Sequence, residues 1–175
     1  NSIVVGMENG FHGINSWGFV TDRDISSVTN RVINFPSNNW VNIRLDEMPN
    51  YLYSHYNEIS SCIVEPIQCT AGDIYLDVDL LKSIQGICKE KGICFIVDEV
   101  QTGFGVSGSY WYSDIIDLDP DVLIFGKKSQ ISGIMVSEKF SEALNSPYRK
   151  LEVTFDGDLM DAVRSEFILK AIEKY

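Results

Sequence analysis

The sequence has few basic residues and no long apolar run, features that proteins binding nucleic acids or membranes need. It holds 14 Lys and Arg residues against 25 Asp and Glu, a formal net charge of −11. Nucleic acids and anionic membrane surfaces bind clustered cations, and none are clustered here, which argues against both as partners. No run approaches the ~18 apolar residues of a membrane span. The first ten residues, NSIVVGMENG, also lack the basic start and apolar stretch of a signal peptide. We therefore expect a cytoplasmic protein.

Cysteine and histidine are too few and too scattered to suggest a metal site. Neither of the two histidines is spaced to share a ligand set with a cysteine. The four cysteines form no CxxC pair, and Cys62, Cys88 and Cys94 lie inside apolar segments. We expect these three to be buried free thiols in a reducing compartment. Cys69 falls in a predicted loop, and its role stays open.

Short apolar runs rich in Ile and Val alternate with segments of helical periodicity, without an internal repeat or linker. The expected strands are 2–5, 62–64, 93–97, 122–125 and 131–136. The expected helices are 79–91, 138–145 and 158–174. Gly92 follows the first helix where a C-cap is expected. Strands that are apolar on both faces and separated by a helix indicate an α/β fold, with a mainly parallel sheet covered by helices on both faces.

Polar clusters follow four of the predicted strands, at 11–13, 65–73, 98–101 and 126–128. In open α/β sheets, ligands bind beyond the carboxyl ends of the strands. We therefore expect these four clusters to converge on one edge of the sheet and to form a binding site there.

Asp98 and Lys127 are the chemically informative residues of these clusters, since each follows an apolar strand. A buried carboxylate needs a facing cation, and a protonated pyridine nitrogen would serve. An apolar setting disfavours the ammonium form of a lysine, which makes it available as an amine for an aldehyde. Singly, such an Asp is most often a cap and such a Lys most often solvated. Together they are the pair that pyridoxal chemistry requires.

Several motifs resemble those of the class III aminotransferases of fold type I. They are FHG at 11–13, SCIVEPIQ at 61–68, FIVDEVQTGFGVSG at 95–108 and PDVLIFGKKSQISG at 120–133. The similarity runs nearly end to end. Within the class, FGKKSQISG, FPSNNW at 35–40 and TFDGDLMDAVRS at 154–165 are most similar to the lysine 6-aminotransferases. The resemblance implies pyridoxal 5'-phosphate as the cofactor.

The same resemblance implies roles for the residues around the cofactor ring. Asp98 would pair with the pyridinium nitrogen, and Gln101 would hydrogen-bond the ring 3-oxygen. Phe11 would stack on one face of the ring and Val100 on the other. His12 joins this cofactor-binding group through the Phe-His-Gly motif, although a histidine there is equally well a cap or a core residue.

Lys127 would be the lysine that holds the cofactor covalently and moves the substrate's α-proton. Its spacing from Asp121 selects it over Lys128, which stays the reserve candidate. Thr154 resembles the threonine that reaches the cofactor phosphate of the neighbouring subunit. That match implies a homodimer with shared active sites.

Two positions depart from the lysine 6-aminotransferases and bear on the substrate. Ile14 replaces an Arg that helps to hold the substrate carboxylate, and Thr70 replaces a Glu that acts in dual substrate recognition. A charge-assisted contact contributes about 1.5–3 kcal/mol. We therefore expect the donor to be an ω-amino acid or an amine, with lysine still a candidate, and the acceptor to be a 2-oxo acid such as 2-oxoglutarate.

Relative to that family, residues 1–175 correspond to a partial large cofactor-binding domain. The glycine-rich segment that cradles the phosphate and the C-terminal small domain are missing from the match. An alternative is therefore a truncated or degenerate homologue without catalysis, which acts only as a folded or dimerising module. A P-loop ATPase, suggested by CFIVDE at 94–99, would require an upstream GxxxxGK[ST] loop that the sequence does not contain.

Overall fold

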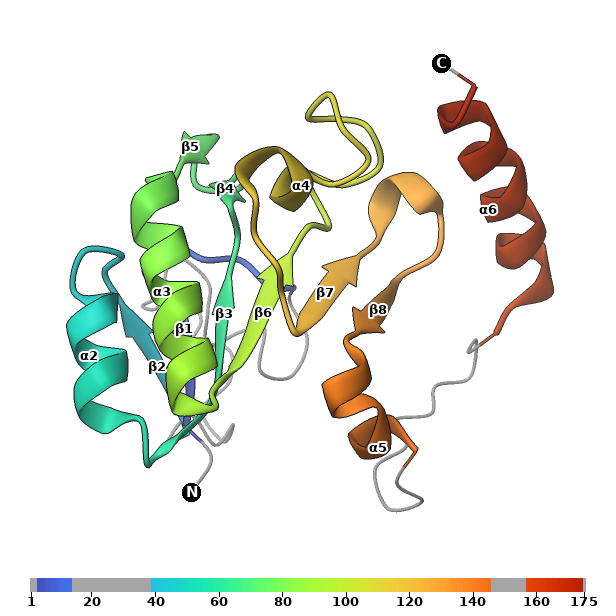
Figure 1. Ribbon diagram of the computed structural model, residues 1–175. Coiled ribbons are helices and arrows are strands. Elements are labelled where there is room, and N and C mark those ends of the chain that lie inside the picture. The colour runs from blue at the N-terminus through green and yellow to red at the C-terminus, as the bar shows by residue number, and fades with distance from the viewer. Residues whose placement is uncertain (1–2, 14–38, 146–156, 175) are drawn as a thin grey trace, which may run out of the picture. The chain divides into compact units, whose positions relative to one another are not determined.

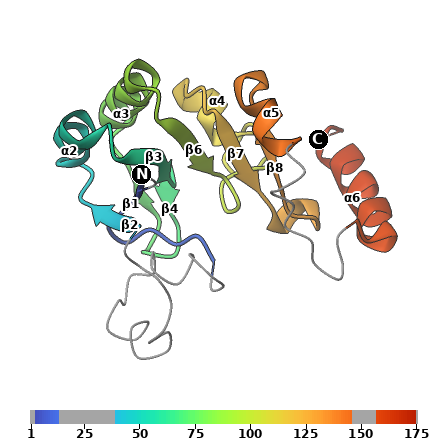
Figure 2. The ribbon, with the colours of Figure 1, turned by 90° about the horizontal axis from the view of Figure 1, so that it is seen from below.

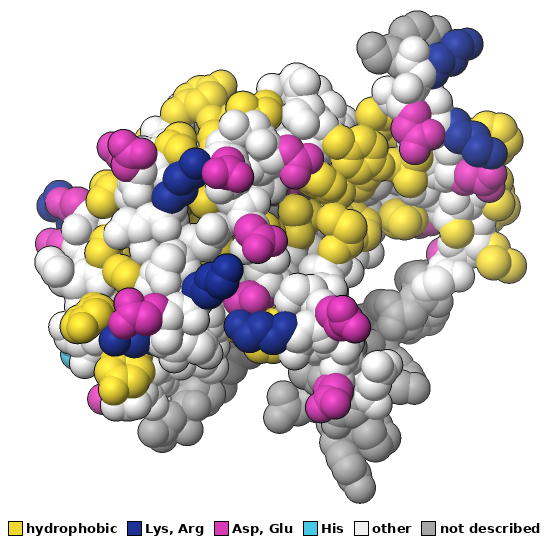
Figure 3. Space-filling model, viewed as in Figure 1, with side chains coloured by type: hydrophobic (Ala, Val, Ile, Leu, Met, Phe, Trp, Pro, Cys, Tyr) yellow, Lys and Arg dark blue, Asp and Glu magenta, His cyan; other side chains and the backbone are white. Residues whose placement is uncertain are grey.

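The computed structural model describes residues 3–13, 39–145 and 157–174. The chain divides into two compact units, Asn1–Asp98 and Glu99–Tyr175. Among the described residues, no helix has the length and apolarity needed to cross a membrane. On the face seen in Figure 3, acidic and basic side chains are interspersed, and the described residues form no continuous basic surface there.

The first unit is built on a parallel sheet (Figure 1). Its strands, in spatial order, are β2 (Trp40–Ile43), β1 (Ile3–Met7), β3 (Ile59–Val64) and β6 (Cys94–Asp98). The side chains of Val5, Val64 and Val97 are completely buried. Strands buried on both faces read as unbroken apolar runs in the sequence. The predicted α/β class with a mainly parallel sheet is thereby confirmed.

Two helices of this unit, α2 (Met48–His55) and α3 (Val78–Lys91), lie on the same face of the sheet (Figure 2). The Asp77 side chain accepts a hydrogen bond from the Leu80 backbone N–H at 3.0 Å and so caps the start of α3. Gly92 ends the helix in the left-handed conformation, with φ 72°, and its N–H donates to the Cys88 carbonyl. The predicted C-cap is therefore confirmed, and a short antiparallel pair, β4 (Ile67–Gln68) and β5 (Ile74–Tyr75), completes the unit.

The second unit contains one antiparallel strand pair, β7 (Val122–Phe125) and β8 (Gly133–Val136). A Cβ added at Gly133 would lie 2.7 Å from the Phe125 ring, so a larger residue there would require that ring to shift. The helical elements are α4 (Tyr112–Ile116), η2 (Lys127–Ser129), η3 (Glu138–Phe140), α5 (Ser141–Leu144) and α6 (Leu159–Ile172). Residues predicted as a single helix, 138–145, thus divide into a 3-10 turn and a short α-helix.

Helix α6 has Asp158 as its N-cap, the residue at which the sequence predicted the helix to start. Asp158 accepts hydrogen bonds from the backbone N–H groups of Met160 and Asp161, at 2.8 and 3.0 Å. Leu159 and Phe167 are exposed on the same helix. Figure 3 shows apolar side chains among the charged ones along α6.

The cysteine predictions hold for two of the three apolar positions. Cys62 and Cys88 are buried free thiols, whereas Cys94 is only partly buried. The prediction for Cys94 was wrong because this residue opens β6, where the strand emerges from the core. Cys69 is partly exposed in the loop after β4.

Candidate active site

The segments that follow β1 and β3 are joined by hydrogen bonds at the carboxyl edge of the parallel sheet. The backbone N–H of Phe11 donates to Oε1 of Glu65 at 2.7 Å. The side-chain amide of Gln68 donates to the carbonyl of Glu8, also at 2.7 Å. Glu65 and Gln68 are 5% and 3% exposed, so these bonds lie in the interior of the unit. They fix the position of the Phe-His-Gly segment.

The segment after β1 also reaches the end of β6. Nδ1 of His12 lies 2.7 Å from Oδ2 of Asp98. An ionised carboxylate can only accept, so the imidazole carries the proton at Nδ1 in this contact. Asp98 is 8% exposed, and a carboxylate at this depth depends on such donors. The predicted clusters at 11–13 and 65–73 therefore converge with the side chain of Asp98 on one edge of the sheet, all within the first unit.

Val100 and Gln101 lie in a tight turn at the start of the second unit. The N–H of Gly103 donates to the Glu99 carbonyl at 2.9 Å, which closes the turn around them. Both residues are partly buried. A Cβ at Gly103 would lie 2.6 Å from the Trp111 ring and 2.9 Å from the Glu99 carbonyl oxygen. Only glycine fits at this point of the turn.

Glu99 anchors this turn through its side chain, which is 0% exposed. One carboxylate oxygen accepts from the Thr102 hydroxyl at 3.0 Å and from the Tyr112 N–H at 2.8 Å. The other accepts from the Ser113 N–H at 2.8 Å and from the Ser113 hydroxyl. Four donors thus compensate the desolvation of one buried carboxylate.

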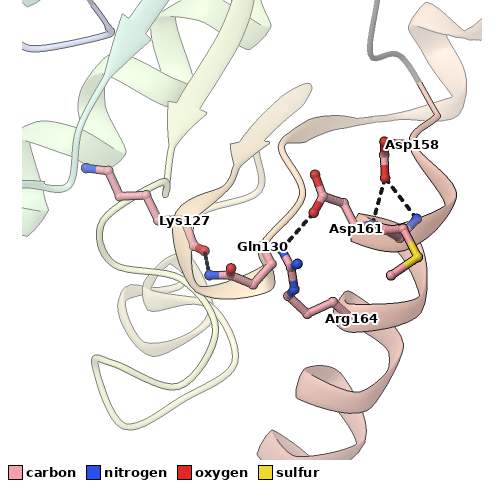
Figure 4. Close-up of polar contacts among 6 residues, drawn as sticks. Lys127, Gln130, Asp158, Asp161 and Arg164 are labelled. Atoms are coloured by element: carbon pink, nitrogen blue, oxygen red, sulfur yellow. Dashed lines mark hydrogen bonds and ion pairs between the residues drawn. The ribbon is translucent and has the colours of Figure 1, made fainter.

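Lys127 follows β7 and Gly126, at the first position of η2. Its backbone is left-handed, with φ 55°, and its side chain is exposed. The Lys127 carbonyl accepts from the backbone N–H and the side-chain amide of Gln130, at 2.9 and 3.1 Å. Figure 4 shows the Lys127 side chain extending away from this turn. The expected apolar surrounding of Lys127 was wrong, because the apolar run of β7 ends two residues earlier.

Lys128 makes different contacts from its neighbour. Its ammonium donates to the carbonyls of Val100, at 3.4 Å, and of Gln101. Its side chain is partly buried. The two adjacent lysines are therefore not equivalent, and only the exposed one projects from the turn.

The remaining predicted residues are distributed as follows. Thr70 is exposed in the loop between β4 and β5. Ile14 and Thr154 lie outside the described residues. Asp98 belongs to the first unit and Lys127 to the second, so their joint contact with one ring stays a prediction.

Sequence reasoning did not find the roles of Glu65, Glu99 and Lys128. A signal for Glu99 was present, because an acidic pair directly after a wholly apolar strand places both carboxylates near the core. The partners of Glu99 come from residues 102–113, and nothing in that stretch marks them as donors.

Comparison with known proteins identifies the family. The family model described as aminotransferase class-III matches residues 4–175. The chain belongs to the class III aminotransferases. A class III relative, the L-lysine-epsilon aminotransferase of Streptomyces clavuligerus, is 35% identical over 119 residues, which are 66% of this chain and 26% of the relative. The 4-aminobutyrate aminotransferase of Schizosaccharomyces pombe is 35% identical over 131 residues, or 74% of this chain and 27% of the relative.

Solved structures of class III enzymes share the fold. The lysine aminotransferase of M. tuberculosis, in its internal aldimine form, superposes with a TM-score of 0.84 at 26% identity. The match covers 98% of this chain and 44% of that enzyme. The chain thus spans about a quarter of its curated relatives and less than half of the solved enzyme. The fold type I prediction is confirmed, and the ATPase interpretation of 94–99 is set aside.

Class III aminotransferases are pyridoxal-phosphate-dependent enzymes. The donor set of this chain fits that cofactor. A carboxylate that is largely buried at a strand end can face a protonated ring nitrogen, and an exposed lysine amine can reach an aldehyde. The residues present are therefore compatible with the family's cofactor.

Proposed function

We propose that this chain contributes to the active site of an enzyme that transfers an amino group from an ω-amino acid or an amine to a 2-oxo acid such as 2-oxoglutarate. The observation that carries the proposal is the buried Asp98 carboxylate, held by His12 at 2.7 Å at the carboxyl end of β6. The turn with Val100 and Gln101 follows it directly. Membership of the class III family supports the same reaction.

Bound pyridoxal phosphate supplies an electron sink for the carbon that loses its proton. Asp98 would accept the N–H of the protonated ring nitrogen and keep that nitrogen charged. His12 orients the carboxylate by binding Oδ2. Phe11 and Val100 would contact the two faces of the ring, and Gln101 would hydrogen-bond the ring 3-oxygen.

Lys127 would hold the cofactor through Nζ and then accept and return the α-proton of the substrate at the same atom. An exposed primary amine on a turn can serve both steps, because its side chain has room to swing between them. Lys128 is less suited, since its ammonium already binds two carbonyl oxygens.

The substrate class follows from two side chains. The chain has Ile14 and Thr70 where the lysine 6-aminotransferases have an Arg and a Glu. It therefore has neither the guanidinium that would bind a substrate carboxylate in a bidentate manner nor the carboxylate that acts in dual substrate recognition at these positions. Amino donors whose carboxylate is distant or absent would lose the least binding free energy from these two replacements. Amines and ω-amino acids other than lysine are therefore the favoured donors.

We further propose a homodimer in which Thr154 of each subunit contributes to the phosphate site of the other. This rests on the TFDG segment at 154–157, which is similar to the corresponding segment of lysine 6-aminotransferases. Light scattering of the protein with and without cofactor tests it, and a monomer under both conditions would contradict it.

Borohydride reduction with pyridoxal phosphate, followed by peptide mapping, tests the central proposal. We expect one reduced pyridoxyl group on Lys127 in the protein expressed from its gene, and none at that position in Lys127→Ala. A donor panel of lysine, 4-aminobutyrate and simple amines with 2-oxoglutarate then ranks the substrates. A pyridoxyl-free protein that also gives no spectral change with the cofactor would favour the non-catalytic alternative.

Ile14→Arg with Thr70→Glu tests the substrate class on the same panel. The double substitution should raise the rate with lysine relative to amines by about tenfold, since it restores one charge-assisted contact. An unchanged ranking of donors would show that these positions do not select the substrate.

A further inference from the structure

Lys128 binds the turn that the proposed function places against the cofactor ring. Its ammonium donates to the carbonyl oxygens of Val100, at 3.4 Å, and of Gln101. These are main-chain groups of the residues that would contact the ring face and the 3-oxygen. Lys128 therefore acts on the backbone of this pair and leaves their side chains available.

Each backbone carbonyl from Glu99 to Thr102 accepts a hydrogen bond. The Glu99 carbonyl accepts from the Gly103 N–H at 2.9 Å, and the Thr102 carbonyl accepts from the Ser107 hydroxyl at 3.1 Å. Lys128 supplies the donor for the two carbonyls between them. Partly buried carbonyls need such partners, and an ammonium has three protons to offer.

Two charged side chains thus hold the turn from different sides. The buried Glu99 carboxylate ties it to the start of α4 through Tyr112 and Ser113. The Lys128 ammonium ties it to η2, the turn on which Lys127 stands. A displacement of η2 would accordingly move the Val100 and Gln101 backbone with it.

We propose that Lys128 is a positioning residue, which couples the cofactor-attaching lysine to the turn that contacts the ring. The proposal rests on the proposed function. The two neighbouring lysines have different roles. Lys127 projects from η2 and is available to react. Lys128 binds the carbonyls of Val100 and Gln101 and sets the position of their backbone. The reserve assignment of Lys128 as the attachment lysine is thereby replaced by a positioning role.

Lys128→Met tests the proposal, because methionine keeps the length of the stem and removes the ammonium. Lys128→Arg keeps the charge and the donors. Lys170→Met is the matched control, since Lys170 loses an ammonium on the exposed side of α6, where it pairs with Glu166. All are made in the protein expressed from its gene.

Amide hydrogen exchange without cofactor gives the first readout. We expect residues 99–104 to exchange about tenfold faster in Lys128→Met, as expected for one lost charge-assisted contact. They should exchange at the wild-type rate in Lys170→Met and near it in Lys128→Arg. Unchanged exchange of 99–104 in Lys128→Met would overturn the proposal, whether or not the protein binds pyridoxal phosphate.

Cofactor binding gives the second readout. Lys128→Met should still carry the reduced pyridoxyl group on Lys127, but with a cofactor Kd raised about tenfold and an altered visible circular dichroism band, both restored in part by Lys128→Arg. A pyridoxyl group on Lys128 in the wild type would overturn the proposal by making it the attachment residue. No pyridoxyl group on any wild-type lysine would refute the proposed function, and the exchange experiment would still decide the role of Lys128.

Discussion

Nδ1 of His12 lies 2.7 Å from Oδ2 of Asp98, and the two side chains are 6% and 8% exposed. Their sequence positions differ by 86 residues. The contact therefore depends on the parallel pairing of β1 with β3 and of β3 with β6, which brings the ends of the three strands to one edge.

This pair predicts a stability change that needs no cofactor. His12→Phe keeps an aromatic ring but removes a donor from a buried carboxylate, so the free energy of unfolding should fall by about 1–3 kcal/mol. Urea unfolding measures it. His55→Phe is the control, since His55 is exposed and stacks on Tyr51, and it should change stability by less than about 0.5 kcal/mol. If the free energy of unfolding falls equally in His12→Phe and His55→Phe, the contact between His12 and Asp98 does not stabilise the fold in the way described.

A second prediction concerns the buried Glu99 carboxylate. In Glu99→Gln, one acceptor oxygen is replaced by an NH₂ group that faces donors at Tyr112 and Thr102, or at Ser113 in the alternative orientation. The free energy of unfolding should fall by about 3 kcal/mol. Chemical denaturation measures this loss, with the exposed Glu142→Gln as the control. A loss below about 1 kcal/mol would mean that the loop relaxes around the amide.

Two glycines give a third prediction, with opposite signs for the same substitution. Gly103→Ala should destabilise the protein by about 1–3 kcal/mol, because its Cβ would overlap the Trp111 ring and the Glu99 carbonyl. Gly86→Ala should stabilise it by about 0.5–1 kcal/mol, because Gly86 lies within α3 and the added Cβ would have no atom within 4 Å apart from its chain neighbours and the backbone of its own helix. Thermal unfolding of both variants checks the signs. A Gly103→Ala protein as stable as the wild type would contradict the packing described at Gly103, and a destabilised Gly86→Ala protein would contradict the open surface at Gly86.

The thiols give a fourth prediction. The hydrogen bond with Cys88, together with burial, raises the pKa of the Cys62 thiol well above its usual range. Cys62 also lies 3.7 Å from the sulfur of Met48, inside the first unit. A thiol reagent at neutral pH should therefore modify the partly exposed Cys69 and Cys94 quickly, and Cys62 and Cys88 only on unfolding.

The same raised pKa of Cys62 gives a pH dependence with a definite sign. The folded state holds the thiol proton more tightly than the unfolded state does, so this stabilisation is complete below the unfolded thiol pKa of about 8.5. It is lost as the pH rises above that value. Unfolding free energies between neutral and alkaline pH should fall more steeply in the wild type than in Cys62→Ala. If the unfolding free energies of the wild type and of Cys62→Ala fall with the same slope, Cys62 is not the cause of the pH dependence.

Patterns in the sequence predicted the elements whose formation depends on local chemistry. The apolar runs at 93–97 and 122–125 predicted β6 and β7. The helical spacing of Leu80, Leu81, Ile84, Ile87 and Cys88 predicted α3, and the structure buries three of these five side chains, Leu81, Ile84 and Cys88. Gly92 marked the helix end because the left-handed conformation favours glycine. Strand β2 and helix α2 were not predicted, since neither has a clear periodic apolar pattern of its own.

The sequence by itself determined the family, the class of fold and the candidate residues Asp98 and Lys127, because those depend on residue types and spacing along the chain. Only the tertiary structure decided that His12 holds Asp98, that Glu99 is a buried anchor, and that Lys128 binds Val100 and Gln101 while Lys127 stays exposed. The physical reason is that the partners of a polar group come from segments far apart in the chain. Packing of the strands and turns selects those partners, and a one-dimensional pattern does not record them.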